Sequence, residues 1–167
     1  SANWQPVMKP LTSWECRHGL GYTTIKALNE GIEAQITYFV PEEGPFELWL
    51  VRLTNQSRAS RRIEAYPFVD LIGGDVALET HYRNILMLYN EASFEPNISA
   101  IVCFKNPFKS WHRPGYAFFS ASFPVESFEC RRESFVGPYG ELAEPAALSL
   151  SRLGCHSGRG EDMVGAL

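Results

Sequence analysis

The strongest constraint on the fold is an alternation of side chains with a period of two in residues 31–40. Every even position from 32 to 40 is apolar, and most positions between them are polar. Such a pattern places apolar side chains on one face of an extended chain, and Pro and Gly follow it directly in residues 41–45. The pattern predicts a half-buried β-strand that ends at a turn.

Other short segments share this strand-like character and are bounded by Gly, Pro or polar turns. We expect strands near residues 21–27, 46–53, 63–71, 98–104, 116–123, 127–135 and 147–153. The segment 46–53 is apolar on both faces, which predicts a central strand that is covered on both sides. Residues 78–90 fit a helix or a strand equally well.

About nine short strands without long intervening helices indicate an all-β fold, an antiparallel β-sandwich or barrel. The length of 167 residues predicts one domain over residues 1–167. The last residues, 162–167, end abruptly on apolar side chains after a Gly-rich loop. We therefore expect the domain to be a fragment of a larger enzyme.

Composition narrows the classes of partner. The net charge of −4 would repel a phosphate backbone, so no nucleic acid is expected. No apolar run reaches the roughly 20 residues of a membrane helix, and no signal peptide begins the chain, so no membrane is expected. The four cysteines are widely spaced, unlike those of a small disulfide scaffold, which predicts reduced thiols and a cytoplasmic protein. They are Cys16, Cys103, Cys130 and Cys155.

No motif in the chain specifies a cofactor or a metal. The GxSxG, P-loop and GxGxxG patterns do not occur, and the cysteines and four histidines lack the paired spacings of zinc sites. We expect no cofactor and no metal. Cys16 and His18 are two residues apart, and we interpret them as a buried thiol beside a hydrogen-bonded histidine rather than as a nucleophile and its base.

Acidic pairs occur but do not define a catalytic site. Glu42 and Glu43 lie in a Pro/Gly turn, and Glu141 and Glu144 lie in a loop. A glycosidase needs two carboxylates at a defined separation across a sugar, and a sequence does not supply that distance. We therefore assign no catalytic residue to this chain.

Aromatic and polar residues at the ends of segments give the better functional signal. Aromatic residues make up 13% of the chain, and an aromatic ring beside Arg, Asn or His suits a sugar, which has apolar ring faces and many hydroxyls. Trp4, Trp14, Tyr22 and Tyr116 also fall at segment ends, where packing of the sandwich is the alternative role. The predicted carbohydrate-binding residues are Arg83, Asn84, Trp111, His112 and Arg113.

Several blocks of the sequence are specific enough to be recognised. The most specific block is residues 15–25, ECRHGLGYTTI, which follows WQPV at residues 4–7. Further blocks are GIE at 31–33, YFVP at 38–41, WLVRLTN at 49–55, YRN at 82–84, FVGPYG at 135–140 and EP at 144–145. Together these blocks resemble glycoside hydrolase family 94, the former glycosyltransferase family 36. The resemblance covers nearly the whole chain and is strongest at residues 4–55 and 134–145.

This resemblance implies a fold and a setting. The family contains cellobiose and chitobiose phosphorylases and cyclic β-1,2-glucan synthases, which phosphorolyse a β-glucosidic bond with inversion or build related glucans. Its N-terminal domain is a galactose-mutarotase-like supersandwich, here expected to be truncated. The catalytic residues lie in an (α/α)6 barrel, which this chain lacks.

The resemblance therefore predicts a non-catalytic domain that packs on such a barrel, binds β-linked glucosides weakly and contributes to homodimer contacts. A free-standing carbohydrate-binding module is the alternative. A mutarotase-like sugar enzyme is a third hypothesis, and it would need a His acid and a Glu base in one cleft.

Overall fold

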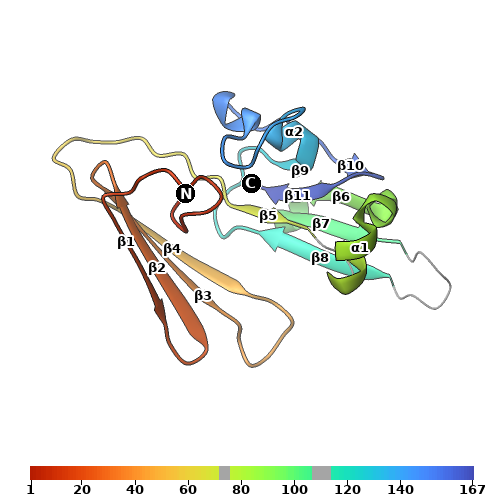
Figure 1. Cartoon of the computed structure of the whole chain (residues 1–167), viewed down its shortest axis with the longest axis horizontal. Coiled ribbons are helices and arrows are strands. Elements are labelled where there is room, and N and C mark those ends of the chain that lie inside the picture. Colours follow the sequence, from red (N-terminus) through yellow and green to blue (C-terminus); the bar gives the residue numbers. More distant parts are fainter. Residues whose placement is uncertain (72–75, 107–113) are drawn as a thin grey trace. The chain divides into compact units, whose positions relative to one another are not determined.

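The computed structural model describes residues 1–71, 76–106 and 114–167. The chain divides into two compact units, Ser1–Glu64 and Ala65–Leu167, and each contains its own antiparallel sheets (Figure 1). Strands predominate over helices, and every strand pairing in the described residues is antiparallel. The predicted all-β antiparallel class is confirmed.

The first unit is a meander of four strands joined by consecutive hairpins, in the order β1-β2-β3-β4. The strands are β1 (Ser13–His18), β2 (Tyr22–Asn29), β3 (Ile32–Phe39) and β4 (Leu48–Asn55). The alternating segment 31–40 forms β3, as predicted. Gly31 has a positive φ of 78° in the tight turn between β2 and β3, a conformation that glycine adopts without a steric penalty.

The register of this sheet separates an apolar face from a polar face, because side chains that lie directly opposite on paired strands share a face. One row across the apolar face is Cys16, Ile25, Ile36 and Val51. The next row, on the polar face, is Glu15, Lys26, Gln35 and Arg52. The sheet is therefore amphipathic, which is how an antiparallel sheet with one solvated face is built.

Strand β4 differs from the prediction for residues 46–53. It lies at the edge of its sheet rather than in the centre, and Leu50 and Val51 are 59% and 58% exposed on opposite faces. The prediction was wrong because apolar side chains on both faces indicate the character of a segment and not its position among strands. That position is set by the meander, in which β4 comes last.

The second unit contains two sheets. The larger has the order β10-β6-β7-β8 and the smaller has the order β5-β11-β9. The strands of the larger sheet are β6 (Asn90–Glu95), β7 (Ala100–Lys105), β8 (Gly115–Ser120) and β10 (Gly158–Arg159). The strands of the smaller sheet are β5 (Phe68–Asp70), β9 (Glu129–Arg131) and β11 (Met163–Ala166).

The core of this unit lies around its last strand. All four residues of β11 are buried, and β11 pairs with β5 on one side and β9 on the other. Ile101 and Cys103 of β7 pack in the same buried cluster as Cys130 of β9 and Met163 of β11. A second cluster joins Val164 and Ala166 to Phe135. The apolar residues near the end of the chain, Met163–Ala166, are thus a central strand of the smaller sheet.

Helical segments replace two of the predicted strands. Residues 76–90 contain helix α1 (Val76–Leu86) and the 3₁₀ turn η1 (Met87–Tyr89), and η2 (Pro96–Ile98) precedes β7. The predicted strand 127–135 is the short strand β9 followed by helix α2 (Arg132–Val136). The predicted strand 147–153 is wrong, since its first part belongs to the 3₁₀ helix η3 (Ala146–Ser149). None of the described helices has the length and apolar character needed to cross a bilayer.

Candidate functional site

Two of the predicted carbohydrate-binding residues lie at the end of helix α1. Arg83 is half-buried, and its Nε donates to Asp162 Oδ1 at 3.0 Å. Asn84 beside it is exposed. A guanidinium carries five N–H donors, so Arg83 has further N–H groups besides the one that binds Asp162. The bond nevertheless ties this side chain to the segment that precedes β11.

The other three predicted residues, Trp111, His112 and Arg113, lie outside the described residues. The five residues are therefore not shown as one site, and the predicted site stays a prediction. The acidic residues of the sequence motifs are not assembled either. Glu42, Glu43, Glu141 and Glu144 are all exposed.

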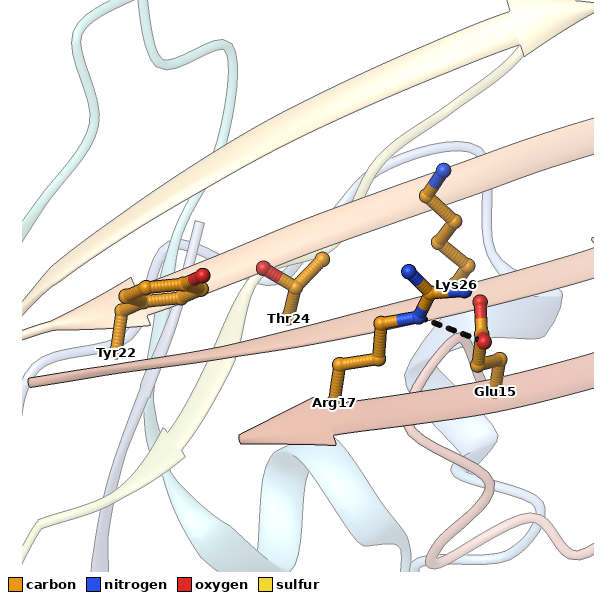
Figure 2. A pocket seen from close by; sticks show the side chains of 5 residues that line it. All are labelled: Glu15, Arg17, Tyr22, Thr24 and Lys26. Carbon is orange, nitrogen blue, oxygen red and sulfur yellow. Dashed lines mark hydrogen bonds and ion pairs between the residues drawn. The ribbon is translucent and has the colours of Figure 1, made fainter. Parts of the chain in front are cut away.

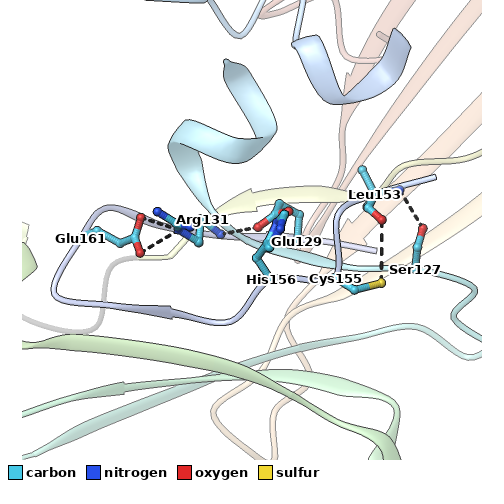
Figure 3. A network of polar contacts seen from close by, with 7 residues as sticks. All are labelled: Ser127, Glu129, Arg131, Leu153, Cys155, His156 and Glu161. Atoms are coloured by element: carbon cyan, nitrogen blue, oxygen red, sulfur yellow. Dashed lines mark hydrogen bonds and ion pairs between the residues drawn. The ribbon is translucent and has the colours of Figure 1, made fainter. Parts of the chain in front are cut away.

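A polar network that the sequence did not reveal surrounds the buried carboxylate of Glu129, at the start of β9. Its side chain is only 1% exposed. One carboxylate oxygen lies 2.7 Å from His156 Nδ1, and the other accepts the backbone N–H of Arg131 at 3.0 Å. The network runs on from Arg131, whose Nε lies 2.9 Å from both carboxylate oxygens of Glu161 (Figure 3). The bond to Glu161 also raises the pKa of the Arg131 guanidinium.

The network fastens the segment 156–162 to the rest of the second unit. His156 binds β9 through its ring, and its carbonyl also accepts the backbone N–H of Cys130 at 3.0 Å. Glu161 binds β9 through Arg131, and Asp162 binds α1 through Arg83. Three side chains of one short segment thus have partners on two separate elements, which is the arrangement of a structural clasp.

This geometry does not resemble a mutarotase-like acid/base pair. Such a pair must leave room for a sugar between its two groups. Glu129 and His156 are bonded directly to each other, and the carboxylate is closed off from solvent. Within the described ranges, no group of three or more His, Cys, Asp or Glu side chains is placed to hold a metal.

The first unit has a shallow hollow on the polar face of its sheet. The hollow has a volume of about 210 Å³ and is lined by Glu15, Arg17, Tyr22, Thr24 and Lys26. Figure 2 shows Tyr22 at one end, the three charged side chains at the other, and Thr24 between them. Four of the five residues belong to the block 15–25. The signal that could have found this hollow was the alternation of residues 15, 17, 22 and 24 across a Gly-rich turn.

Cys16 and His18 lie on the apolar face of the same sheet. Cys16 is half-buried and its Sγ lies 3.7 Å from His18 Nε2, while His18 Nδ1 lies 3.0 Å from the Thr23 hydroxyl. The histidine is thus hydrogen-bonded, as predicted, although the thiol is only partly covered.

Comparison with known families decides the membership of the chain. The family model described as "Glycosyl hydrolase 94, supersandwich domain" matches residues 1–167. The chain belongs to glycoside hydrolase family 94. The resemblance seen in the sequence blocks is therefore confirmed, and the antiparallel sheets described above are those of the family's supersandwich domain.

Three relatives of this family 94 chain illustrate its setting. It is 32% identical to the solabiose phosphorylase of Paenibacillus borealis, over 98% of this chain and 21% of the relative. It is 30% identical to the N,N'-diacetylchitobiose phosphorylase of Vibrio furnissii, over 91% of this chain and 19% of the relative. It is 23% identical to the cyclic beta-(1,2)-glucan synthase NdvB of Rhizobium meliloti, over 81% of this chain and 4% of the relative. The chain spans about a fifth of the length of the phosphorylases.

Proposed function

We propose that this chain is a non-catalytic, carbohydrate-associated domain of a disaccharide phosphorylase or a β-glucan synthase-like protein. The observation that carries the proposal is the match of all 167 residues to one domain of a family whose phosphorylases are about five times longer. In this proposal the domain packs on an (α/α)6 catalytic barrel, helps to shape the substrate cleft, and contributes to homodimer contacts in the cytoplasm. Its two units belong to a galactose-mutarotase-like supersandwich.

The side chains of the described residues support a non-catalytic role. Inverting phosphorolysis needs a general acid at the leaving oxygen and phosphate on the opposite side of the sugar. The Glu129 carboxylate is enclosed and serves as an acceptor for His156 and Arg131. The exposed pairs Glu42/Glu43 and Glu141/Glu144 lie in turns and loops without bonded histidine or arginine partners in the described contacts.

The chain by itself is expected to release no sugar phosphate. Incubation of the purified 167-residue protein with inorganic phosphate and cellobiose, chitobiose or sophorose should leave the disaccharide intact, because the described residues assemble no acid/base pair for the reaction. Chromatography of the reaction mixture measures how much sugar 1-phosphate is released. A complete family 94 phosphorylase is the positive control. Robust turnover that disappears when a residue of this chain is mutated would contradict the proposal.

Weak glycan binding is the second part of the proposal. We expect a dissociation constant of about 1 mM or higher, which corresponds to a binding free energy of no more than about 4 kcal/mol. The reason is that a domain without its catalytic barrel encloses only part of a ligand. Arg83, Asn84, Trp111, His112 and Arg113 are the proposed contacts, through hydroxyl hydrogen bonds and ring stacking. An NMR titration with β-linked glucose oligomers measures the dissociation constant and identifies the residues that contact the glycan. Micromolar binding that survives both Trp111→Ala and Arg83→Ala would show that both are wrong.

The two alternatives predict different results. A free-standing carbohydrate-binding module would bind with full strength without any further domain, and its gene would encode no barrel. A mutarotase-like enzyme would interconvert the anomers of glucose, which polarimetry follows directly. The direct bond between Glu129 and His156 counts against this last activity.

A further inference from the structure

The hollow on the polar face of the first sheet is not used by the proposed role at Arg83. We propose that it is a second glycan subsite, which binds a single neutral pyranose ring with Tyr22 as its platform and with Glu15, Arg17 and Thr24 as hydrogen-bonding groups. The inference rests on the proposed function, because it assigns a specific place to the carbohydrate contact of this domain. It goes beyond that function because the place is a strand face and not a loop.

The register of the first hairpin builds the subsite. Arg17 lies directly opposite Thr24, and Glu15 lies directly opposite Lys26. These two rows are separated by one residue on each strand, so their side chains project from the same face. Tyr22 precedes Thr24 by two positions, on the side of the turn, and projects from that face as well. The hairpin therefore sets an aromatic ring, a hydroxyl and a charged group in one line along the strand.

The ring of Tyr22 is placed by its neighbour Gly19. Tyr22 is 50% exposed, so much of its ring is open to a ligand. A Cβ atom at Gly19 would lie 2.3 Å from both Cε1 and Cζ of Tyr22, so the ring rests closely on the backbone of the turn. The backbone N–H of Gly19 also donates to the carbonyl of Tyr22 at 2.9 Å, which closes the turn. The small residue at position 19 thus allows the ring its observed position.

The polar end of the hollow offers both donors and acceptors. Glu15 Oε1 lies 2.7 Å from Arg17 Nε, so the carboxylate is held in place and keeps lone pairs for sugar hydroxyls. The Thr24 hydroxyl lies 3.1 Å from the Thr37 hydroxyl. Sugar hydroxyls act as donors and acceptors, and an aromatic ring next to such groups matches a pyranose with an apolar face.

The size of the hollow favours a single ring, and its charge does not require an anion. The lining holds two cations, Arg17 and Lys26, and one carboxylate, Glu15, which is paired with Arg17, so most of the charge is neutralised within the hollow. The volume of about 210 Å³ is smaller than the roughly 300–1,000 Å³ of pockets that enclose drug-sized ligands. The hollow therefore suits one ring of a longer glycan, with the rest of the glycan in solvent.

An NMR titration of the 167-residue chain with methyl β-D-glucopyranoside tests the subsite. We expect saturable shifts of the amide signals of residues 15–26, in the millimolar range. Tyr22→Ala should weaken this binding about tenfold, because a well-placed aromatic contact contributes up to about that factor. Tyr22→Phe, which keeps the ring, should bind within about threefold of the wild type. Tyr139→Ala is the matched control, because Tyr139 is a fully exposed tyrosine of the second unit.

A second variant separates binding from folding. Gly19→Ala displaces only the far end of the Tyr22 side chain, so the hairpin should remain folded while the affinity falls as in Tyr22→Ala. Unchanged affinity in both Tyr22→Ala and Gly19→Ala would overturn the subsite. So would shifts confined to Arg83 and Asn84, which would leave the proposed function intact, and so would inorganic phosphate binding more tightly than the glucoside. Failure of the proposed function itself is read separately, from the phosphorolysis assay.

Discussion

Alkylation of the folded chain with iodoacetamide at pH 8 is expected to be at least about 100-fold slower at Cys103 and about 1,000-fold slower at Cys130 than in the unfolded chain. The thiolate is the reactive form of cysteine. Burial raises the pKa of Cys103 from its ordinary value of 9.0 to about 11. Burial, with the nearby charges of Glu129 and Cys103, raises the pKa of Cys130 to about 12. Each increase of the pKa by one lowers the thiolate fraction at a given pH about tenfold.

The other two cysteines are the internal controls. Cys155 is exposed and Cys16 is half-buried, so both should be labelled first. Peptide mass spectrometry after timed labelling distinguishes the four sites, and labelling in urea without reductant should find four thiols. Equal rates at Cys103 and Cys155 would contradict the buried arrangement, and two missing thiols in urea would indicate a disulfide.

The same pKa shifts predict the direction of an alkaline effect on stability. Between pH 9 and pH 11 the unfolded chain loses protons from Cys103 and Cys130 that the folded chain retains. The contribution of these thiols to the free energy of unfolding is therefore complete below pH 9 and is lost as the pH rises toward 11 and 12. Urea unfolding at pH 9 and at pH 11 should therefore give a lower free energy of unfolding at pH 11.

The first unit was largely predictable because its information is local. Strand β3 lies within one residue of each end of the alternating segment 31–40, and Gly and Pro mark the turns around it. The hollow was also within reach, because a period of two on either side of a Gly-rich turn places Glu15, Arg17, Tyr22 and Thr24 on one face. The prediction instead looked for binding groups in loops, where they usually collect.

The second unit was less predictable because its contacts are long-range. Residues 147–153 are apolar and short, which does not distinguish a strand from a buried helical turn. The turn is favoured here by Pro145, which has a φ of −64° directly before η3. Glu129 and His156 are 27 residues apart, and their bond exists only because the segment just before β10 lies against β9. No local sequence pattern predicts such a long-range contact.

Replacement of Glu129 by alanine is expected to lower the free energy of unfolding by about 3 kcal/mol. Removing one partner of a buried polar pair leaves the other partner without its bond, which costs about 1–3 kcal/mol and more for charged groups. Here the loss affects both His156 and the backbone N–H of Arg131. The truncation of this buried side chain also leaves a cavity, which adds to the cost.

Urea unfolding followed by far-UV circular dichroism measures this effect. Glu126→Ala is the matched control, because Glu126 is an exposed glutamate three residues earlier and should change stability by no more than about 0.5 kcal/mol. Glu161→Ala should cost about 1 kcal/mol or less, since its bond with Arg131 is partly open to solvent. Glu129→Gln keeps an acceptor oxygen and the side-chain volume, so its cost should fall between those of Glu161→Ala and Glu129→Ala.

The order of these variants tests the clasp itself. If the segment 156–162 is fastened mainly through Glu129, then His156→Ala should also destabilise the chain, but by less than Glu129→Ala, because His156 is half-exposed and water can replace part of its bond. Its loss would leave the Glu129 carboxylate with the Arg131 N–H as a remaining donor. Equal stability of Glu129→Ala and Glu126→Ala would show that the buried carboxylate does not hold the segment, and the network around β9 would then have to be explained by binding rather than by folding.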